Sequence, residues 1–185
     1  VLFLGVALSV LPAAGLVART ALSVMPAHEG RRLGTAMDDS TIRTAVDAWL
    51  ADATAAEAAY GHISTWGTSG VTSMSYLFDG ASSFNQDIST WSVDNVRDMH
   101  RMFSGASLFN QDLSNWRVDK VTDMSWMFHY ASAFDQDLGW CVDDEVSLSY
   151  AFYGTPCEST SCGVVPISPA PTLRPIPAPT TPNPS

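Results

Sequence analysis

The residues best suited to chemistry are aspartates that recur every 25 positions, each preceded two positions earlier by Asn or Asp. If segments 25 residues apart stack like strands, the carboxylates lie about 4.8 Å apart. At that separation they repel one another by roughly 1 kcal/mol in water. Either backbone N–H groups of a tight bend hold each carboxylate, or a calcium ion lies between them. The aspartates are Asp87, Asp112 and Asp137, preceded by Asn85, Asn110 and Asp135.

The bend is the interpretation we favour, because the sequence has no EF-hand loop and no glycine-aspartate calcium repeat. A Gly-rich phosphate loop, a GxSxG elbow and an HExxH helix are also missing. His100 and His129 stand where neighbouring repeats have Ser or Asp, so we expect both on the surface. The sequence therefore predicts a protein that is not an enzyme and uses no cofactor.

Three cysteines, Cys141, Cys157 and Cys162, stand near the end of the repeats. In a secreted chain they predict a disulfide that tightens the C-terminal cap. The bond joins either Cys141 or Cys157 to Cys162, closes a small loop and contributes about 2 to 3 kcal/mol. One cysteine is left over in either case. The alternative is three reduced thiols in an intracellular chain.

Large aromatic residues follow the same 25-residue period, with one step of 24 near the end. A fixed period in the twenties is typical of a solenoid, in which each unit buries its apolar face against its neighbours. We expect matching rings to form buried columns, each ring removing roughly 150 to 250 Å² from water. The columns are Trp66, Trp91, Trp116 and Trp140; Phe78, Phe103, Phe128 and Phe152; and Phe84, Phe109 and Phe134.

Two local patterns alternate within each unit. The stretch VRDMHRMF, residues 96–103, has helical apolar spacing and predicts a short helical turn that ends at Gly105. Tyr130 replaces this glycine one unit later, so that turn is expected to end differently. Trp91 and Val93 alternate across Ser92, which predicts a short strand in a parallel ladder.

The stretch FNQDISTWSVDNVRDMHRMFSGAS, residues 84–107, resembles the 25-residue unit of BspA-like leucine-rich-repeat surface proteins. The resemblance covers about residues 62–163. It implies an α/β-type repeat solenoid, with short parallel strands on one face and short helical turns on the other. It also implies a secreted or membrane-tethered protein, often linked with adhesion, that has no catalytic residues. Many relatives carry a lipoprotein cysteine after the signal, whereas this chain has none before Cys141.

The flanking segments differ in composition from the repeats. The apolar start predicts a signal peptide or membrane anchor, and the proline-rich end predicts an extended stalk. The chain does not begin with Met, so we expect it to be a fragment. A helical cap is predicted between them, with Ser40 beginning one helix and the Thr54-x-x-Glu57 capping box a second. The boundaries are 1–27 signal or anchor, 28–39 linker, 40–61 cap, 62–163 four repeats with a Cys-containing cap, and 164–185 proline-rich linker.

Nineteen acidic residues against nine basic ones leave a formal net charge of −10. Such a chain repels phosphate backbones, which excludes general nucleic-acid binding. We expect a secreted or cell-surface module that binds an extracellular protein or glycan and meets a membrane only through an uncleaved N-terminal segment. The alternatives are an acidic structural layer of a cell wall or matrix, possibly calcium-dependent, and a targeting module for a further domain. The predicted interaction face comprises Thr90, Ser92, Asp94, Asn115, Arg117 and Asp119.

Overall fold

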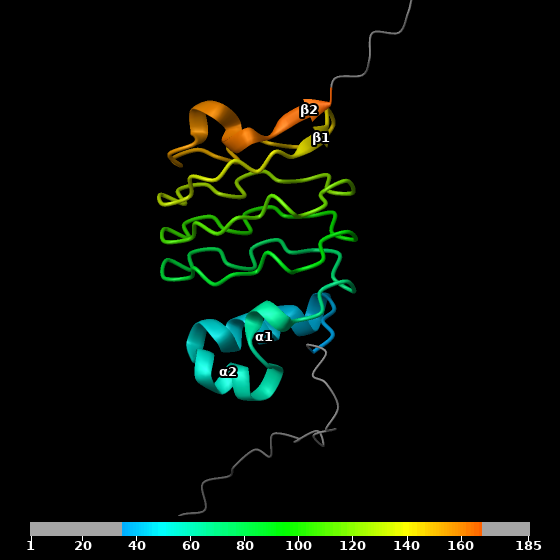
Figure 1. Cartoon of the computed structure of the whole chain (residues 1–185), viewed down its shortest axis with the longest axis vertical. Helices are drawn as coiled ribbons and strands as arrows, with labels where there is room; N and C mark the ends of the chain where they lie inside the picture. Colours follow the sequence, from blue (N-terminus) through cyan, green and yellow to red (C-terminus); the bar gives the residue numbers. More distant parts are fainter. Residues whose placement is uncertain (1–34, 168–185) are drawn as a thin grey trace, which may run out of the picture. The chain divides into compact units, whose positions relative to one another are not determined.

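The computed structural model describes residues 35–167. The predicted signal or anchor, residues 28–34 of the linker and residues 168–185 of the proline-rich segment lie outside the described residues. Within residues 35–167, no helix is both long and apolar enough to cross a membrane. The elements are α1 Asp39–Ala51, α2 Ala53–Tyr60, the 3₁₀ helices η1 Ile63–Thr65 and η2 Glu158–Gly163, and the strands β1 Cys141–Asp143 and β2 Val165–Ile167 (Figure 1).

Helices α1 and α2 occupy the segment predicted as the N-terminal cap, but they begin at other residues than expected. Asp38 is the N-cap of α1, and its carboxylate accepts hydrogen bonds from the amides of Ser40 and Thr41. Asp52 caps α2 in the same way. The predictions that Ser40 and Thr54 cap the helices are therefore wrong. An aspartate just upstream takes each role, because its carboxylate reaches the free amides of the first turn.

The helical cap packs onto the first repeat through both its apolar face and its polar side chains. The buried side chains of α1 include Trp49, whose ring meets Trp66 edge-on at 6.0 Å between centroids. Asp39 accepts hydrogen bonds from the amide and hydroxyl of Thr72, both at 2.6 Å. Arg43 Nη1 donates to the carbonyl of Ser75 at 2.7 Å. These contacts cover the first coil with ordered side chains.

The repeats form coils that lie on one another and are joined by backbone hydrogen bonds (Figure 1). Alternate amides of one coil donate to carbonyls 24 residues later, beginning with Met74 N to Asp98 O at 2.8 Å. Tyr76, Phe78 and Gly80 continue the series. The same pattern joins the next pair of coils, and the last pair shows it with an offset of 23 residues, as from Phe128 N to Ala151 O. The 25-residue period of the sequence is thus the length of one coil.

The bonded side of each coil consists of consecutive turns, so the predicted helical turn at 96–103 is wrong. The amides of Met102 and Ser104 donate to carbonyls three residues earlier, Met99 and Arg101. Arg101 has φ 55°, a left-handed value that a right-handed helix excludes. Its equivalents have φ 60°, 61° and 55°, and they are Tyr76, Trp126 and Tyr150. Apolar residues at i, i+3 and i+4 point inward from such turns too, and for this reason the spacing imitated a helix.

The predicted strand at Trp91–Val93 is also absent, because this segment lies between two tight turns of its own coil. Trp91 N donates to Ile88 O at 3.0 Å, and Val96 N donates to Val93 O at 2.9 Å. Among residues 35–167, paired strands occur at the end of the stack, where β1 runs parallel to β2 with Cys141 opposite Val165. Isolated parallel bridges link the other coils at Ser73, Asp98, Asp123 and Ser147.

Buried aromatic side chains fill the interior of the coils. The phenylalanine columns are continuous: Phe78 stacks on Phe103 at 5.4 Å and Phe103 on Phe128 at 5.3 Å. Phe152 completes this column, and Phe84, Phe109 and Phe134 stack beside it at 5.8 and 6.0 Å. The tryptophans stack in two pairs, Trp66 with Trp91 at 6.0 Å and Trp116 with Trp140 at 6.4 Å.

Three buried tryptophans of the repeats also tie their coil to the preceding segment through the indole N–H. Trp91 Nε1 donates to the carbonyl of Ile63 at 2.9 Å. Trp116 and Trp140 donate in the same way to Ile88 and Leu113, one coil earlier. The indole therefore supplies apolar area and satisfies a buried polar group at once. A phenylalanine at these positions would leave the carbonyl without this donor.

Candidate interaction surfaces

The three repeated aspartates each cap the bend that follows them. Asp87 accepts from the amide and hydroxyl of Ser89 at 2.9 and 2.7 Å, and Asp112 accepts from the amide of Ser114 at 2.8 Å. Asp137 accepts from Gly139 N at 3.2 Å. The Ser89 hydroxyl and amide hold the pKa of Asp87 below its usual range. These contacts match the structural bend that we favoured, and each carboxylate has a donor from its own coil.

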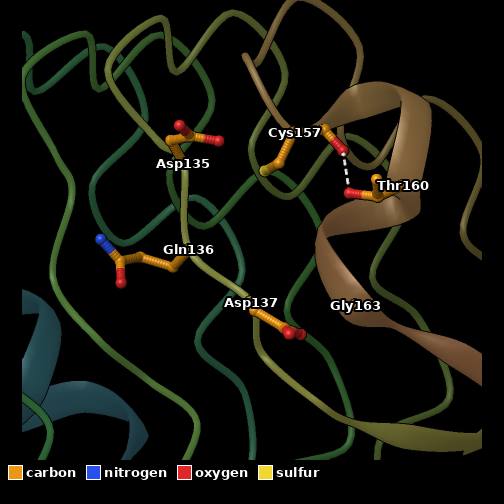
Figure 2. Close-up of a pocket in the computed structure, with 6 residues that line it drawn as sticks. All are labelled: Asp135, Gln136, Asp137, Cys157, Thr160 and Gly163. Atoms are coloured by element: carbon orange, nitrogen blue, oxygen red, sulfur yellow. Dashed lines mark hydrogen bonds between the residues drawn. The ribbon is translucent and has the colours of Figure 1, made fainter.

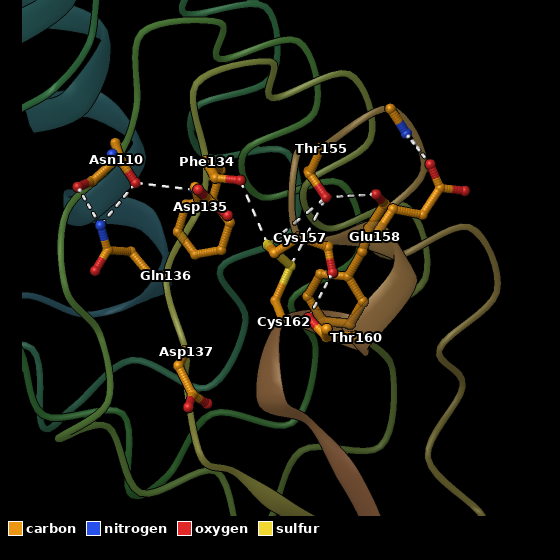
Figure 3. The surroundings of a disulfide bond; sticks show 12 residues. Asn110, Phe134, Asp135, Gln136, Asp137, Thr155, Cys157, Glu158, Thr160 and Cys162 are labelled. Atoms are coloured by element: carbon orange, nitrogen blue, oxygen red, sulfur yellow. Dashed lines mark hydrogen bonds between the residues drawn. A yellow bond between two sulfur atoms is a disulfide. The ribbon is translucent and has the colours of Figure 1, made fainter.

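A second ladder of side-chain amides joins the coils two residues before the aspartates. Asn85 Oδ1 accepts from the amide of Asn110 at 3.0 Å and from Gln111 Nε2 at 2.8 Å. Asn110 Oδ1 accepts from Asp135 and Gln136 with the same distances (Figure 3). Because the residue that accepts is an amide in both steps, the ladder links neighbouring coils without placing two carboxylates together.

An open pocket of about 260 Å³ lies beside the last coil, between Asp137 and the C-terminal cap (Figure 2). Asp135, Gln136, Cys157 and Thr160 also line it. Among the described residues, no group of three or more His, Cys, Asp or Glu side chains is placed to hold a metal ion. Asp135 and Asp137 are the two carboxylates among the residues that line the pocket.

The structure contains one of the two disulfides that the sequence allowed. Cys157 and Cys162 are joined, with 4.8 Å between their Cα atoms (Figure 3). Cys141 is an exposed free cysteine at the start of β1. Cys157 and Cys162 are both buried in the core cluster, and Cys157 Sγ lies 3.4 Å from the carbonyl oxygen of Phe134. Helix η2 lies at the end of the stack opposite to α1 (Figure 1).

The predicted interaction face is exposed and polar, but most of its contacts stay within the face. Arg117 lies 3.7 Å from Asp94 and 3.6 Å from Asp119, with 76% of its side chain exposed. Such solvent-exposed ion pairs contribute about 0 to 1 kcal/mol. Thr90 donates to the carbonyl of Ser64 at 2.6 Å, and Ser92 donates to Asp94 at 3.0 Å. Asn115 is exposed.

A second surface, which the sequence analysis missed, is an aromatic cluster on the turn side of the coils. Its signal was present in the sequence, because equivalent positions of four successive coils carry Tyr, Arg, Trp and Tyr. Because Arg101 is not aromatic, it interrupts the series, and the series was not recognised as an aromatic column. The aromatic cluster comprises Tyr76, His100, Arg101, Trp126, His129, Tyr130, Tyr150 and Tyr153, which contact one another in a chain.

A line of hydrogen bonds under this cluster contains the residue types of a catalytic triad. His100 Nδ1 lies 2.7 Å from Ser125 Oγ, which donates to Asp123 Oδ1 at 2.5 Å. His100 Nε2 lies 3.1 Å from the hydroxyl of Tyr76. In a nucleophilic triad the histidine stands between serine and carboxylate, whereas here the serine stands in the middle. Ser125 is also buried, so we interpret the line as a support that orients His100 and Tyr76.

Comparison with known protein families identifies one family whose sequence pattern matches this chain. Residues 46–161, more than half of the chain, match the family described as "Mycoplasma protein of unknown function, DUF285". The chain belongs to this family. The match supports a surface repeat family related to the one that the sequence resembles, and it does not extend to a leucine-rich-repeat assignment. No curated protein and no solved structure matches the chain.

Proposed function

We propose that the chain is a non-catalytic, secreted or cell-surface module that binds other proteins or extracellular surfaces, built on a repeat solenoid related to leucine-rich repeats. The turns described above take the place of the helical segments of that class. Stacked coils expose broad surfaces on which extended partners dock. The stacked geometry of the repeats supports this role.

The observation that carries the proposal is the contrast between inward and outward positions of the coils. Inward positions repeat the same aromatic residue from coil to coil. Outward positions change: Ser92 becomes Arg117, and Tyr76 becomes Arg101. A purely structural layer needs uniform outer faces, because every coil would make the same lattice contact. Differing outer residues on a constant scaffold favour recognition of a specific partner.

The proposal is tested with the full chain on an array of purified extracellular proteins and glycans, with and without calcium. We expect saturable binding to at least one protein or glycan, unchanged by calcium. No saturable binding, together with calcium-dependent multimers in light scattering, would overturn the proposal and favour an acidic structural layer. A catalytic domain adjoining the chain in the full-length reading frame would favour the targeting role instead.

A further inference from the structure

The outermost ring positions of four successive coils form one continuous row. The guanidinium of Arg101 lies over the rings of Tyr76 and Trp126, at 5.9 and 5.4 Å from their centroids. Trp126 contacts the ring of Tyr150 at 4.8 Å. Cation–π and ring–ring contacts of this kind hold the side chains in register across the coils. The row is therefore a formed surface and not a set of separate exposed side chains.

Tyrosines widen this row to one side and remain exposed to solvent. His129 contacts Tyr130 at 4.2 Å and Tyr153 at 5.5 Å. The exposed fractions of Tyr76, Tyr130 and Tyr150 are 51%, 56% and 60%. Tyr, Trp and Arg are the residues that most often supply the binding energy of protein interfaces, where Lys and Glu are depleted. The aromatic cluster has this composition.

Arg101 is the fixed positive charge of the cluster and has no acidic partner in residues 35–167. It takes part in no salt bridge and no side-chain hydrogen bond there, although the chain has nineteen acidic residues. Burial, and then the charge of Arg101, lowers the pKa of His129, which favours the neutral imidazole. A guanidinium offers five donors in a planar arrangement that fits a carboxylate. The open donors of Arg101 therefore fit a carboxylate from outside the chain.

The way the rings pack favours a protein over a sugar as the source of that carboxylate. Sugars stack on the free face of an aromatic ring. Trp126 is already contacted by Arg101, by Tyr150 and by His129, whose ring lies at 4.3 Å. Tyr130 and Tyr153 meet edge-on at 5.4 Å. Ring edges and hydroxyl groups suit the mixed apolar and polar side chains of a peptide.

Hydrogen bonds to neighbouring residues also hold side chains of the cluster in place, which reduces the conformational entropy lost on binding. His100 bridges the Tyr76 hydroxyl and Ser125, and Ser125 is held by Asp123. At the other end, the Gly154 amide donates to Glu158 at 3.0 Å, next to Tyr153. The carboxylates of Asp123 and Glu158 are thus engaged by donors of the protein itself.

We infer that the aromatic cluster is a docking surface for a protein segment in which a carboxylate side chain stands among apolar or aromatic side chains. Arg101 binds the carboxylate, and the tyrosines pack against the neighbouring side chains. The inference rests on the proposed interaction function and names its surface and the chemistry of its partner. Charge complementarity carries it, because the guanidinium contacts two rings and forms no salt bridge within residues 35–167.

The test measures binding of soluble probes to the immobilised full chain by biolayer interferometry. The probes are a random copolymer of Glu and Tyr, a Lys and Tyr copolymer, polyglutamate and hyaluronan. We expect the Glu and Tyr copolymer to bind most tightly. Arg101→Gln and Tyr150→Ser should each weaken this binding at least about tenfold, the change typical of a residue central to an interface. Arg101→Lys should fall between Arg101→Gln and the parent.

Arg97→Gln is the matched control, because Arg97 is an exposed arginine outside both the aromatic cluster and the predicted interaction face. It should leave binding unchanged. Near-ultraviolet circular dichroism checks that the variants are folded. If Arg101→Gln does not fold, Tyr150→Ser takes its place as the test of the surface.

Several results would overturn the inference. The first three are equal binding of the Lys and Tyr copolymer, preference for hyaluronan, and a loss of binding in Arg97→Gln as large as in Arg101→Gln. The others are absence of binding to every probe and self-association of the parent that Arg101→Gln abolishes. A ligand found on the extracellular array that binds Arg101→Gln as well as the parent would overturn this inference while leaving the proposed function intact.

Discussion

At the scale of single residues, burial separates the tryptophans that hold the coils together from the one on the surface. Trp91 is 3% exposed, stacks on Trp66 and donates its indole N–H to Ile63. Trp126 is partly exposed and lies in the aromatic cluster. The same residue type therefore has two roles, which the 25-residue register distinguishes.

Replacement of Trp91 by Ala is expected to lower the free energy of unfolding by about 3 to 5 kcal/mol, because it leaves a cavity in the core. The loss should appear as an earlier, still cooperative transition in a denaturant melt. Trp126→Ala is the control and should cost about 1 kcal/mol or less, as substitutions at the surface do. Equal effects of the two substitutions would contradict the difference in burial.

The aspartates at the bends predict a loss of stability in acid. Hydrogen bonds from Thr41 and Ser40 lower the pKa of Asp38 to about 2, and the Ser89 and Ser114 bends lower the pKa of Asp87 and Asp112. A depressed folded-state pKa stabilises the fold above the unfolded-state value, near 3.9. This stabilisation is lost as the pH falls through the folded-state pKa. Unfolding free energy should therefore decrease between about pH 4 and pH 2.

Asp87→Asn keeps the side-chain oxygen but cannot titrate, so it should make this acid dependence less steep. Ser89→Ala removes the hydroxyl donor and should act in the same direction. Urea melts at several pH values measure the slope. Identical slopes in both variants and the parent would show that the bend does not favour the charged carboxylate.

At the scale of elements, the turn side of each coil depends on residues with left-handed backbone. Gly80 and Gly154 have φ 70° and 79°, and Tyr130 takes the same place with φ 56°. The prediction that the turn at Tyr130 ends differently is therefore wrong. Tyr130 tolerates this conformation while its ring packs on Gly154, where a Cβ atom would lie 2.7 Å from Tyr130 Cδ1.

Two alanine substitutions separate backbone strain from steric contact. Gly80→Ala should cost about 1 kcal/mol, because alanine disfavours positive φ and its Cβ would meet nothing within 4 Å. Gly154→Ala adds the contact with Tyr130 and should cost more. Thermal melts of both variants give the comparison. A Gly154→Ala variant as stable as Gly80→Ala would mean that the ring of Tyr130 moves away freely.

The C-terminal cap makes a prediction about thiols. Denatured, non-reduced protein should react with one equivalent of iodoacetamide, at Cys141, and with three after reduction. Cys157→Ser should lower the free energy of unfolding by about 2 kcal/mol, the chain-entropy value for so short a loop. Cys141→Ser, at an exposed position, should be close to neutral. Three reactive thiols without reduction would contradict the cap.

The aromatic period was readable from the sequence because size and spacing alone determine which rings can stack. The backbone conformation could not be read from the sequence, since Met99, Met102 and Phe103 point inward from a helix and from consecutive turns alike. Both cap residues were misplaced by two positions because Asp38 and Asp52 compete with nearby Ser and Thr for the same amides. The aromatic cluster was overlooked because exposed rings have no buried neighbours to impose a uniform residue type.

At the scale of the whole molecule, the acidic charge of −10 gives the uncompensated Arg101 its significance. The acidic surface keeps non-specific anionic partners away, while the aromatic cluster offers rings and one guanidinium. Arg117, in contrast, already contacts Asp94 and Asp119. The two arginines thus distinguish a surface that is internally neutralised from one that is open to a partner.

The measurement that tests the account most directly is NMR detection of scalar couplings across hydrogen bonds in uniformly labelled protein. The coil arrangement predicts couplings from the amide of Phe103 to the carbonyl of Met127 and from Met99 to Asp123, both 24 residues apart. It also predicts a coupling from Met102 to Met99, three residues earlier. Couplings from residues 96–103 only to carbonyls four residues earlier would show a helix and would contradict the stacked coils.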